Sequence, residues 1–346
     1  MYKRQIQLYL ALTCPQIAAK TRGVALRINI LHFTTFHSDA IQERAGLFHA
    51  APCDLHRRKT SLLREVAPKL FDAGMTQSAK GLYPQTDPLM NSWRSPQAYG
   101  FGSDINIYCG EAPSVSRDFV DFTLGLLTQH PAFVELAQVT STLHKSYPDG
   151  QDLELIDTSL APWHIMDTNE LNRLKIVAQQ HLRGGYPFTR YNTKYTYIAA
   201  AVALRFLHSI SSDALGMIRR IVLDEDCESV AFLESHGRGF IPICQVNPQL
   251  RIEHSICFWR NVSPVSERTK SVYLERYQDM IDEKIMANDR CPADSMTKVV
   301  GTWIPETMAL PSLGMPEDSF TLVLDGNPTP YHTSKVFRIV QRDAAW

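Results

Sequence analysis

Few residues in this chain are arranged for chemistry, and the acidic run Asp224-Glu225-Asp226 is the foremost group. It directly follows residues 218–223, IRRIVL, whose composition is typical of a strand. Enzymes of the α/β class often place acids after a strand, where neighbouring carboxylates can bind a divalent cation. No phosphate-binding element accompanies this run, so we favour a solvated turn between a strand and a loop.

The common catalytic and ligand-binding motifs are missing from the sequence. It has no G-x-x-x-x-G-K-[ST], no G-x-G-x-x-G after a strand, no G-x-S-x-G and no H-E-x-x-H. The twelve histidines are scattered, and none of the seven cysteines forms a C-x-x-C pair. We therefore expect no catalysis, no cofactor and no metal site.

The composition indicates an ordinary globular protein. The 346 residues can bury a large core, with 44% hydrophobic and 21% charged residues. The 35 basic and 36 acidic residues give no excess charge for attracting nucleic acid. No apolar run approaches the ~18 residues of a membrane helix. Scattered cysteines are typical of free thiols in a reducing compartment, so we expect an intracellular protein, cytoplasmic or nuclear.

The apolar pattern predicts helices alternating with short strands. Helices are expected at 5–22, at 54–82 as one or two helices, from 116 to about 130, after the capping sequence Asp167-Thr168-Asn169-Glu170, at 195–210 and at 268–287. Strands are expected at 26–34, 218–223, 251–259 and 320–324. The stretch 195–210, YTYIAAAVALRFLHSI, is apolar nearly all round, which predicts a buried helix.

These elements predict an α/β fold that is helix-rich overall. Its sheet should be irregular and layered, with short strands separated by helices, loosely like a leucine-rich repeat. Residues 83–113 are rich in Pro and Gly, which indicates a long surface loop. No change of composition separates the two sides of this loop, so residues 26–346 are expected to form a single domain.

The segment 13–36, TCPQIAAKTRGVALRINILHFTTF, resembles a pattern of fungal F-box-like proteins. In that family a helix with a Cys-Arg-Gln-Ile motif leads to a strand ending in Asn-x-x-x-Phe. Cys14, Gln16 and Ile17 match the first motif, with Pro15 in place of Arg, and Asn29 and Phe33 match the second. The segments IRRIVLDED (218–226) and GRGFIPICQVNPQLRIEH (237–254) are also similar to this family.

The resemblance implies an interaction protein, the substrate-recognition part of an F-box-like molecule, with residues 1–25 as a remnant of an F-box helix. The family's Leu-Pro start and first two helices are not found before Cys14. Binding to a Skp-type adaptor is therefore expected to be weak or absent, and Leu8, Leu12 and Ile17 would lack their packing partners. The alternative is an α/β enzyme with an unrecognised site near Asp224-Asp226. A pocket that joined the acidic run to a converging His or Lys would favour the enzyme.

Overall fold

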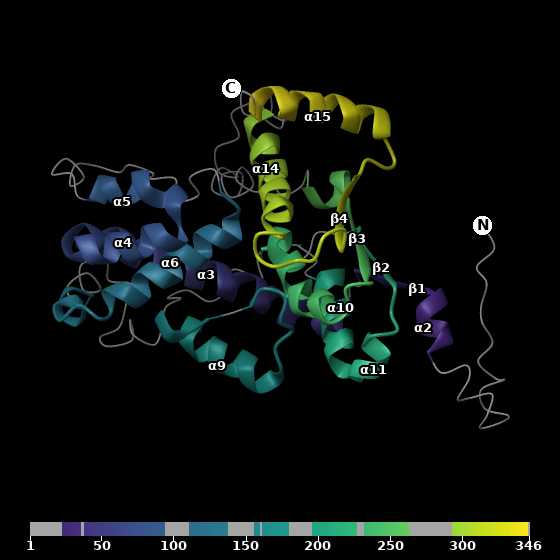
Figure 1. Ribbon diagram of the computed structural model, residues 1–346, viewed down its shortest axis with the longest axis horizontal. Helices are drawn as coiled ribbons and strands as arrows, with labels where there is room; N and C mark the ends of the chain where they lie inside the picture. The colour runs from purple at the N-terminus through teal and green to yellow at the C-terminus, as the bar shows by residue number, and fades with distance from the viewer. Residues whose placement is uncertain are drawn as a thin grey trace, which may run out of the picture. The chain divides into compact units, whose positions relative to one another are not determined.

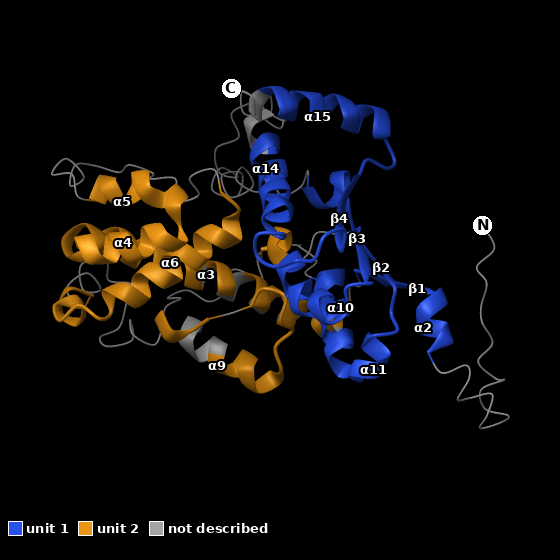
Figure 2. Ribbon diagram, viewed as in Figure 1, with its two compact units in different colours: residues 1–37, 196–229, 236–346 blue, residues 38–195, 230–235 orange. Residues whose placement is uncertain are grey.

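The computed structural model describes residues 23–35, 38–93, 111–137, 156–159, 161–179, 196–226, 232–262 and 293–344. The chain divides into two compact units (Figure 2). Unit 1 comprises residues 1–37, 196–229 and 236–346, and unit 2 comprises residues 38–195 and 230–235. The expected helices at 5–22 and 268–287, with Leu8, Leu12 and Ile17, lie outside the described residues. The two units are defined by their internal contacts, whereas a domain is defined by its ability to fold independently. The expectation that residues 26–346 form a single domain therefore stays a prediction.

Unit 1 is built on a parallel sheet of four strands in the order β1-β2-β3-β4. The strands are β1 Ile30–Thr34, β2 Arg220–Glu225, β3 Arg251–Cys257 and β4 Phe320–Asp325. Each strand pairs with the next one along the chain. Adjacent parallel strands must be joined by crossover connections. When each right-handed crossover leads to the next strand in the same direction across the sheet, all the crossovers lie on the same face of the sheet. The α/β fold class with a helix-rich chain is confirmed.

Helices α10 Ala199–Ser209 and α14 Ala293–Ala309 lie on one face of this sheet (Figure 1). Side chains that alternate toward this face are buried, as Ile221, Ile252 and Ile256 show. Helix α15 Pro330–Ala344 runs beside α14. The remaining described elements of unit 1 are α2 Val24–Ile28, α11 Ser212–Leu215, α12 Ile241–Val246 and a π-helical turn, η6 Phe258–Val262. The 3-10 helix η5 Leu233–Phe240 begins in unit 2 and continues into unit 1.

The turns that lead into β2 and β3 share one construction. Arg219 folds back so that Nη1 donates to the carbonyls of Gly216 and Ile218, three and one residues earlier. Arg251 does the same with the carbonyls of Pro248 and Leu250. The two turns therefore repeat one local geometry. The buried Asn247 amide then donates to the carbonyls of Leu215 and Ile218, which ties the second turn to the first.

Unit 2 is helical in its described part. It contains α3 Asp39–Leu70, α4 Ala73–Leu82, η2 Pro84–Thr86, α5 Asp87–Trp93, α6 Pro113–Leu127 and α9 Thr168–Gln179. An aromatic cluster lies in its core, where Trp93 stacks on Phe119 and meets Phe71 edge-on. Leu63 and Val66, within the helical stretch predicted at 54–82, are fully buried there. That stretch forms two helices, and the first begins well before residue 54.

Several predicted elements differ from the structure; the strand expected at 251–259 ends at Cys257 and is followed by η6. Residues 24–28 form helix α2, and only residues 30–34 form the first strand; the VALRI sequence is rich in good helix formers and none of it is buried against a sheet. Helix α10 is buried on one side only, since Val202 and Phe206 are more than a third exposed. The predicted loop at 83–113 begins with η2 and α5, because apolar Leu89, Met90 and Trp93 bind this stretch to the core. Residues 94–110 lie outside the described part.

Candidate functional site: the open face of the parallel sheet

The acidic run Asp224-Glu225-Asp226 is divided between the two faces of the sheet. Successive side chains of a strand point to opposite faces. Glu225 points toward the helices and its side chain has no exposed surface, whereas the Asp224 side chain is 43% exposed on the other face. The three carboxylates therefore do not converge on one point, as a cation site in this run would require.

The Glu225 carboxylate receives three hydrogen bonds in the interior of unit 1. The backbone N–H groups of Ala199 and Ala200 donate to it over 3.0 and 3.1 Å, and His254 Nε2 lies 3.2 Å from Oε1. A carboxylate at this position satisfies free N–H groups in the first turn of α10 and complements the positive end of the helix dipole. The His254 ring is enclosed edge-on by Trp303 and Phe320. This buried pair has no access for a substrate, and we assign it to stability.

The exposed acids of the run have partners close by. Asp224 Oδ2 lies 3.8 Å from His32 Nδ1 on the neighbouring strand, and the Thr35 hydroxyl donates to Asp226. Within the described ranges, no three His, Cys, Asp or Glu side chains are grouped so that they could hold a metal ion.

The face of the sheet that bears Asp224 carries polar side chains in rows across the strands. The register sets two full rows: His32, Val222, Glu253 and Thr321, and then Thr34, Asp224, Ser255 and Val323. A shorter row holds Ile30, Arg220 and Arg251. We call these eleven residues the open face. Most are exposed or half-exposed, although Val222 is buried. Arg220 Nη2 donates to Glu253 Oε2 over 2.9 Å, so oppositely charged side chains bridge two strands.

Three other residues of unit 1 have structural roles. Trp259 Nε1 donates to Thr333 Oγ1, which joins η6 to the first turn of α15. A Cβ on Gly237 would lie 3.2 Å from the side chains of Leu310 and Phe320, so close packing accounts for this glycine. Burial raises the pKa of Cys244 to about 12, which leaves its thiol protonated and unreactive at neutral pH.

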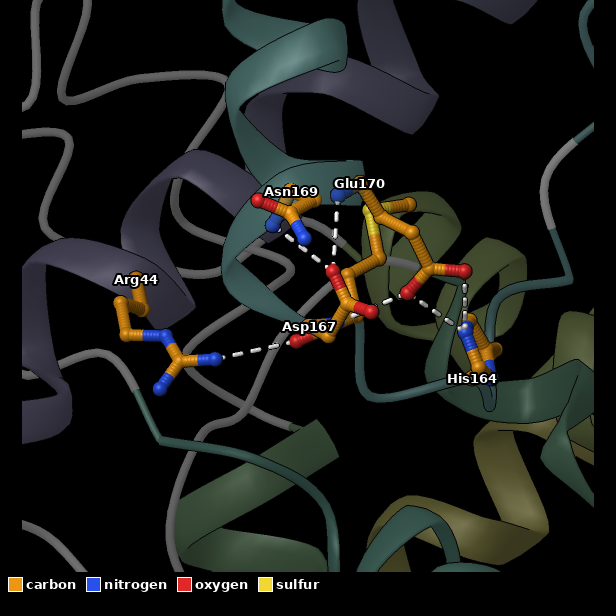
Figure 3. Close-up of polar contacts among 6 residues, drawn as sticks. Arg44, His164, Asp167, Asn169 and Glu170 are labelled. Atoms are coloured by element: carbon orange, nitrogen blue, oxygen red, sulfur yellow. Dashed lines mark hydrogen bonds and ion pairs between the residues drawn. The ribbon is translucent and has the colours of Figure 1, made fainter.

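The predicted helix start at Asp167 is confirmed (Figure 3). Asp167 Oδ1 accepts from the backbone N–H groups of Asn169 and Glu170, and Glu170 Oε2 accepts from the N–H of Asp167. This reciprocal arrangement is a capping box. The hydrogen bond from the backbone N–H of Glu170 lowers the pKa of Asp167. The pKa of Glu170 is lowered mainly by the hydrogen bond from the backbone N–H of Asp167, and secondly by the hydrogen bond with His164. Arg44 Nη2 donates to the Met166 carbonyl at the same point.

A charged cluster in unit 2 had no signal in the sequence. Lys59 Nζ, almost fully buried on α3, donates to Asp121 Oδ1 on α6 over 3.0 Å and to the Thr158 carbonyl over 2.8 Å. Arg117, one turn before Asp121, pairs with Glu234 over 3.2 Å. Burial, together with the charges of Arg117 and Lys59, lowers the pKa of His56 to about 4. The partners are far apart along the chain, so periodicity could not have revealed them.

Comparison of the chain with protein-family models, with curated proteins and with solved structures gives no match. The class of protein is therefore defined by its fold and site alone. It is a helix-rich α/β protein whose parallel sheet carries described helices on one face. In the described part of the chain, no helix combines the length and apolarity that crossing a bilayer requires.

Proposed function

We propose that this chain is an interaction protein that binds a protein partner through the open face of its parallel sheet. The observation that carries the proposal is the difference between the two faces. On the two central strands, β2 and β3, side chains toward α10 and α14 are buried, whereas on the opposite face His32 and Thr321 are exposed and Asp224 is half-exposed. A rigid sheet that presents polar side chains at fixed spacings suits recognition of another surface.

The resemblance to F-box-like proteins supports a narrower version of the proposal. Three segments carry it, and the second, residues 218–226, contains β2 and the acidic run. In that version the open face recognises the protein that an F-box-like molecule selects.

The geometry of the run Asp224-Glu225-Asp226 supports the enzyme alternative less well than it supports partner binding. Its site near Asp224-Asp226 needs carboxylates that act together, whereas Glu225 is turned away and its oxygens are bound by Ala199, Ala200 and His254. Asp224 lies 3.8 Å from His32 and Asp226 accepts from the Thr35 hydroxyl, but these side chains are exposed to solvent, which weakens the electrostatic effects on which catalysis depends.

Site-specific photocrosslinking tests the proposal. A photoreactive residue at Thr321 should capture a discrete partner from an extract of the source cells, and the same residue at Arg338 on the exposed side of α15 should not. The captured partner is then purified and its affinity measured. Ser255→Arg, which places a bulky charge in the centre of the open face, should weaken binding about tenfold.

The matched control is Ser334→Arg, the same change at an exposed position of α15, which should leave the affinity unaltered. Circular dichroism establishes that both variants are folded. Equal capture from Thr321 and Arg338, or equal affinities of the two arginine variants, would contradict binding through the open face.

A further inference from the structure

Residues 232–235 lie in unit 2 as a short segment, far in sequence from the helices that they contact. The Phe232 ring lies under the Arg117 guanidinium, with 4.0 Å from Cζ to the ring centre. The His56 ring meets the same phenyl ring edge-on, at 6.0 Å between centres. Two residues later, Glu234 Oε1 accepts from Arg117 Nη1 over 3.2 Å. One arginine therefore contacts both an aromatic ring and an acid of this segment.

The segment holds these two side chains at a fixed separation. Ser235 donates to the Phe232 carbonyl through its backbone N–H over 3.0 Å and through its hydroxyl over 2.8 Å. This turn brings Phe232 and Glu234 to the same side of the segment, where Arg117 reaches both. The Arg117 and Glu234 side chains are only 13% and 14% exposed, so their ion pair is poorly screened by solvent.

The surface that receives the segment comes from helices on either side. His56 and Lys59 lie one turn apart on α3, and Arg117 and Asp121 lie one turn apart on α6. Lys59 and Asp121 pair directly across the two helices. Asp121 thereby balances the positive charge of Lys59 and also interacts electrostatically with Arg117, and the segment adds the Glu234 carboxylate at 3.2 Å from Arg117 Nη1.

The backbone of Phe232 indicates that the segment meets this surface under constraint. Its φ of 54° lies in the left-handed region, which a bulky side chain rarely adopts. The chain continues from Ser235 directly into unit 1, where Phe240 is buried in the core. A segment from another molecule would have no such continuation to satisfy.

We propose that α3 and α6 of unit 2 form a receptor site for a short protein segment in which an acid follows an aromatic residue by two positions. Residues 232–235 are its internal occupant, and a partner's segment of the same chemistry competes with them. The aromatic ring binds by cation–π contact and the acid by a charge-assisted hydrogen bond, both to Arg117. This site is separate from the open face of the sheet and does not depend on it.

The test uses the occupant's own sequence as the probe. A fluorescein-labelled peptide of residues 228–236, ESVAFLESH, is titrated with the full chain and its fluorescence anisotropy followed. The double variant Phe232→Ala, Glu234→Gln vacates the site and should bind the peptide about tenfold more tightly than the native chain. Adding Arg117→Gln to the double variant should remove that gain. Adding Arg205→Gln, at an exposed position of α10, should leave it unchanged.

A second measurement decides the outcome if the double variant does not fold. Hydrogen exchange of the native chain is recorded with and without excess ESVAYLESH, whose tyrosine distinguishes its fragments by mass. Faster exchange at residues 232–235 in the presence of this peptide would support displacement. The proposal is overturned by a folded double variant that binds no better than the Arg117→Gln combination, or by exchange that the peptide leaves unaltered.

Discussion

Replacing Glu225 with alanine tests the assignment of the buried carboxylate to stability. The side chain is fully enclosed, and its two oxygens receive the N–H groups of Ala199 and Ala200 and face His254 Nε2. Alanine removes every one of these acceptors at once. The first turn of α10 and the buried imidazole would then keep polar groups in an apolar interior with nothing to bind.

The size of the effect follows from these contacts. A hydrogen bond to a charged group is worth about 1.5–3 kcal/mol net, and three such bonds on one carboxylate are not additive. Each buried donor that is left without an acceptor costs about 1–3 kcal/mol. We expect Glu225→Ala to lower the free energy of unfolding by about 3–5 kcal/mol. Glu225→Gln should cost less, because its amide oxygen can still accept from the helix.

Urea denaturation provides the assay, followed by circular dichroism and by tryptophan fluorescence, since Trp303 lies 5.8 Å from the His254 ring. The matched control is Asp224→Ala, the same truncation one residue earlier on the exposed face. It should change the free energy of unfolding by about 0.5 kcal/mol or less. Similar losses for the two variants, or a loss below about 1 kcal/mol for Glu225→Ala, would refute the assignment.

Three further predictions concern unit 2. His56 has a pKa of about 4 in the folded chain against 6.5 unperturbed, so unfolding takes up a proton between these values. Stability should fall by about 3 kcal/mol as the pH drops from 6.5 to 4, a dependence that His56→Gln removes in urea titrations. Asp121→Ala should destabilise the chain by about 2–4 kcal/mol, because it leaves the charge of Lys59 buried without its carboxylate. Lys59→Met should cost less, because the Asp121 carboxylate that it leaves is partly exposed to solvent. Equal losses in the two variants would contradict this asymmetry. Asp167→Ala should speed hydrogen exchange in the first turn of α9, and acidification through the lowered pKa of Asp167 should do the same in the native chain but not in an Asp167→Asn variant.

The strands could be predicted because a half-buried strand shows as an alternation of apolar and polar residues along the sequence. Residues 251–257 alternate Arg, Ile, Glu, His, Ser, Ile, Cys, and the structure buries every second side chain. The cap at Asp167 is equally local, since all its bonds span two or three residues. The same alternation predicted a strand from residue 26, whereas residues 24–28 form helix α2, because two or three alternating apolar residues fit a helix as well as a strand.

The polar clusters could not be predicted, because they pair residues from distant elements. Lys59 and Asp121 are 62 positions apart, and Arg117 and Glu234 are 117 apart. The sequence shows only charged residues on a helix, a pattern that usually marks a solvated surface. Only the packing of α3 against α6 decides that these particular charges are buried.

The acidic run divides its side chains between the face that holds α10 and the face through which we propose that a partner binds. Alternation sends Glu225 inward, where it holds α10 to the sheet, and Asp224 outward to the open face. A substitution on the outward side can change what the sheet binds without disturbing its helices, since the two sets of side chains do not touch the same neighbours. The run then needs no catalytic role to account for three successive acids: each carboxylate already has a different partner, and only the outward ones can meet another protein.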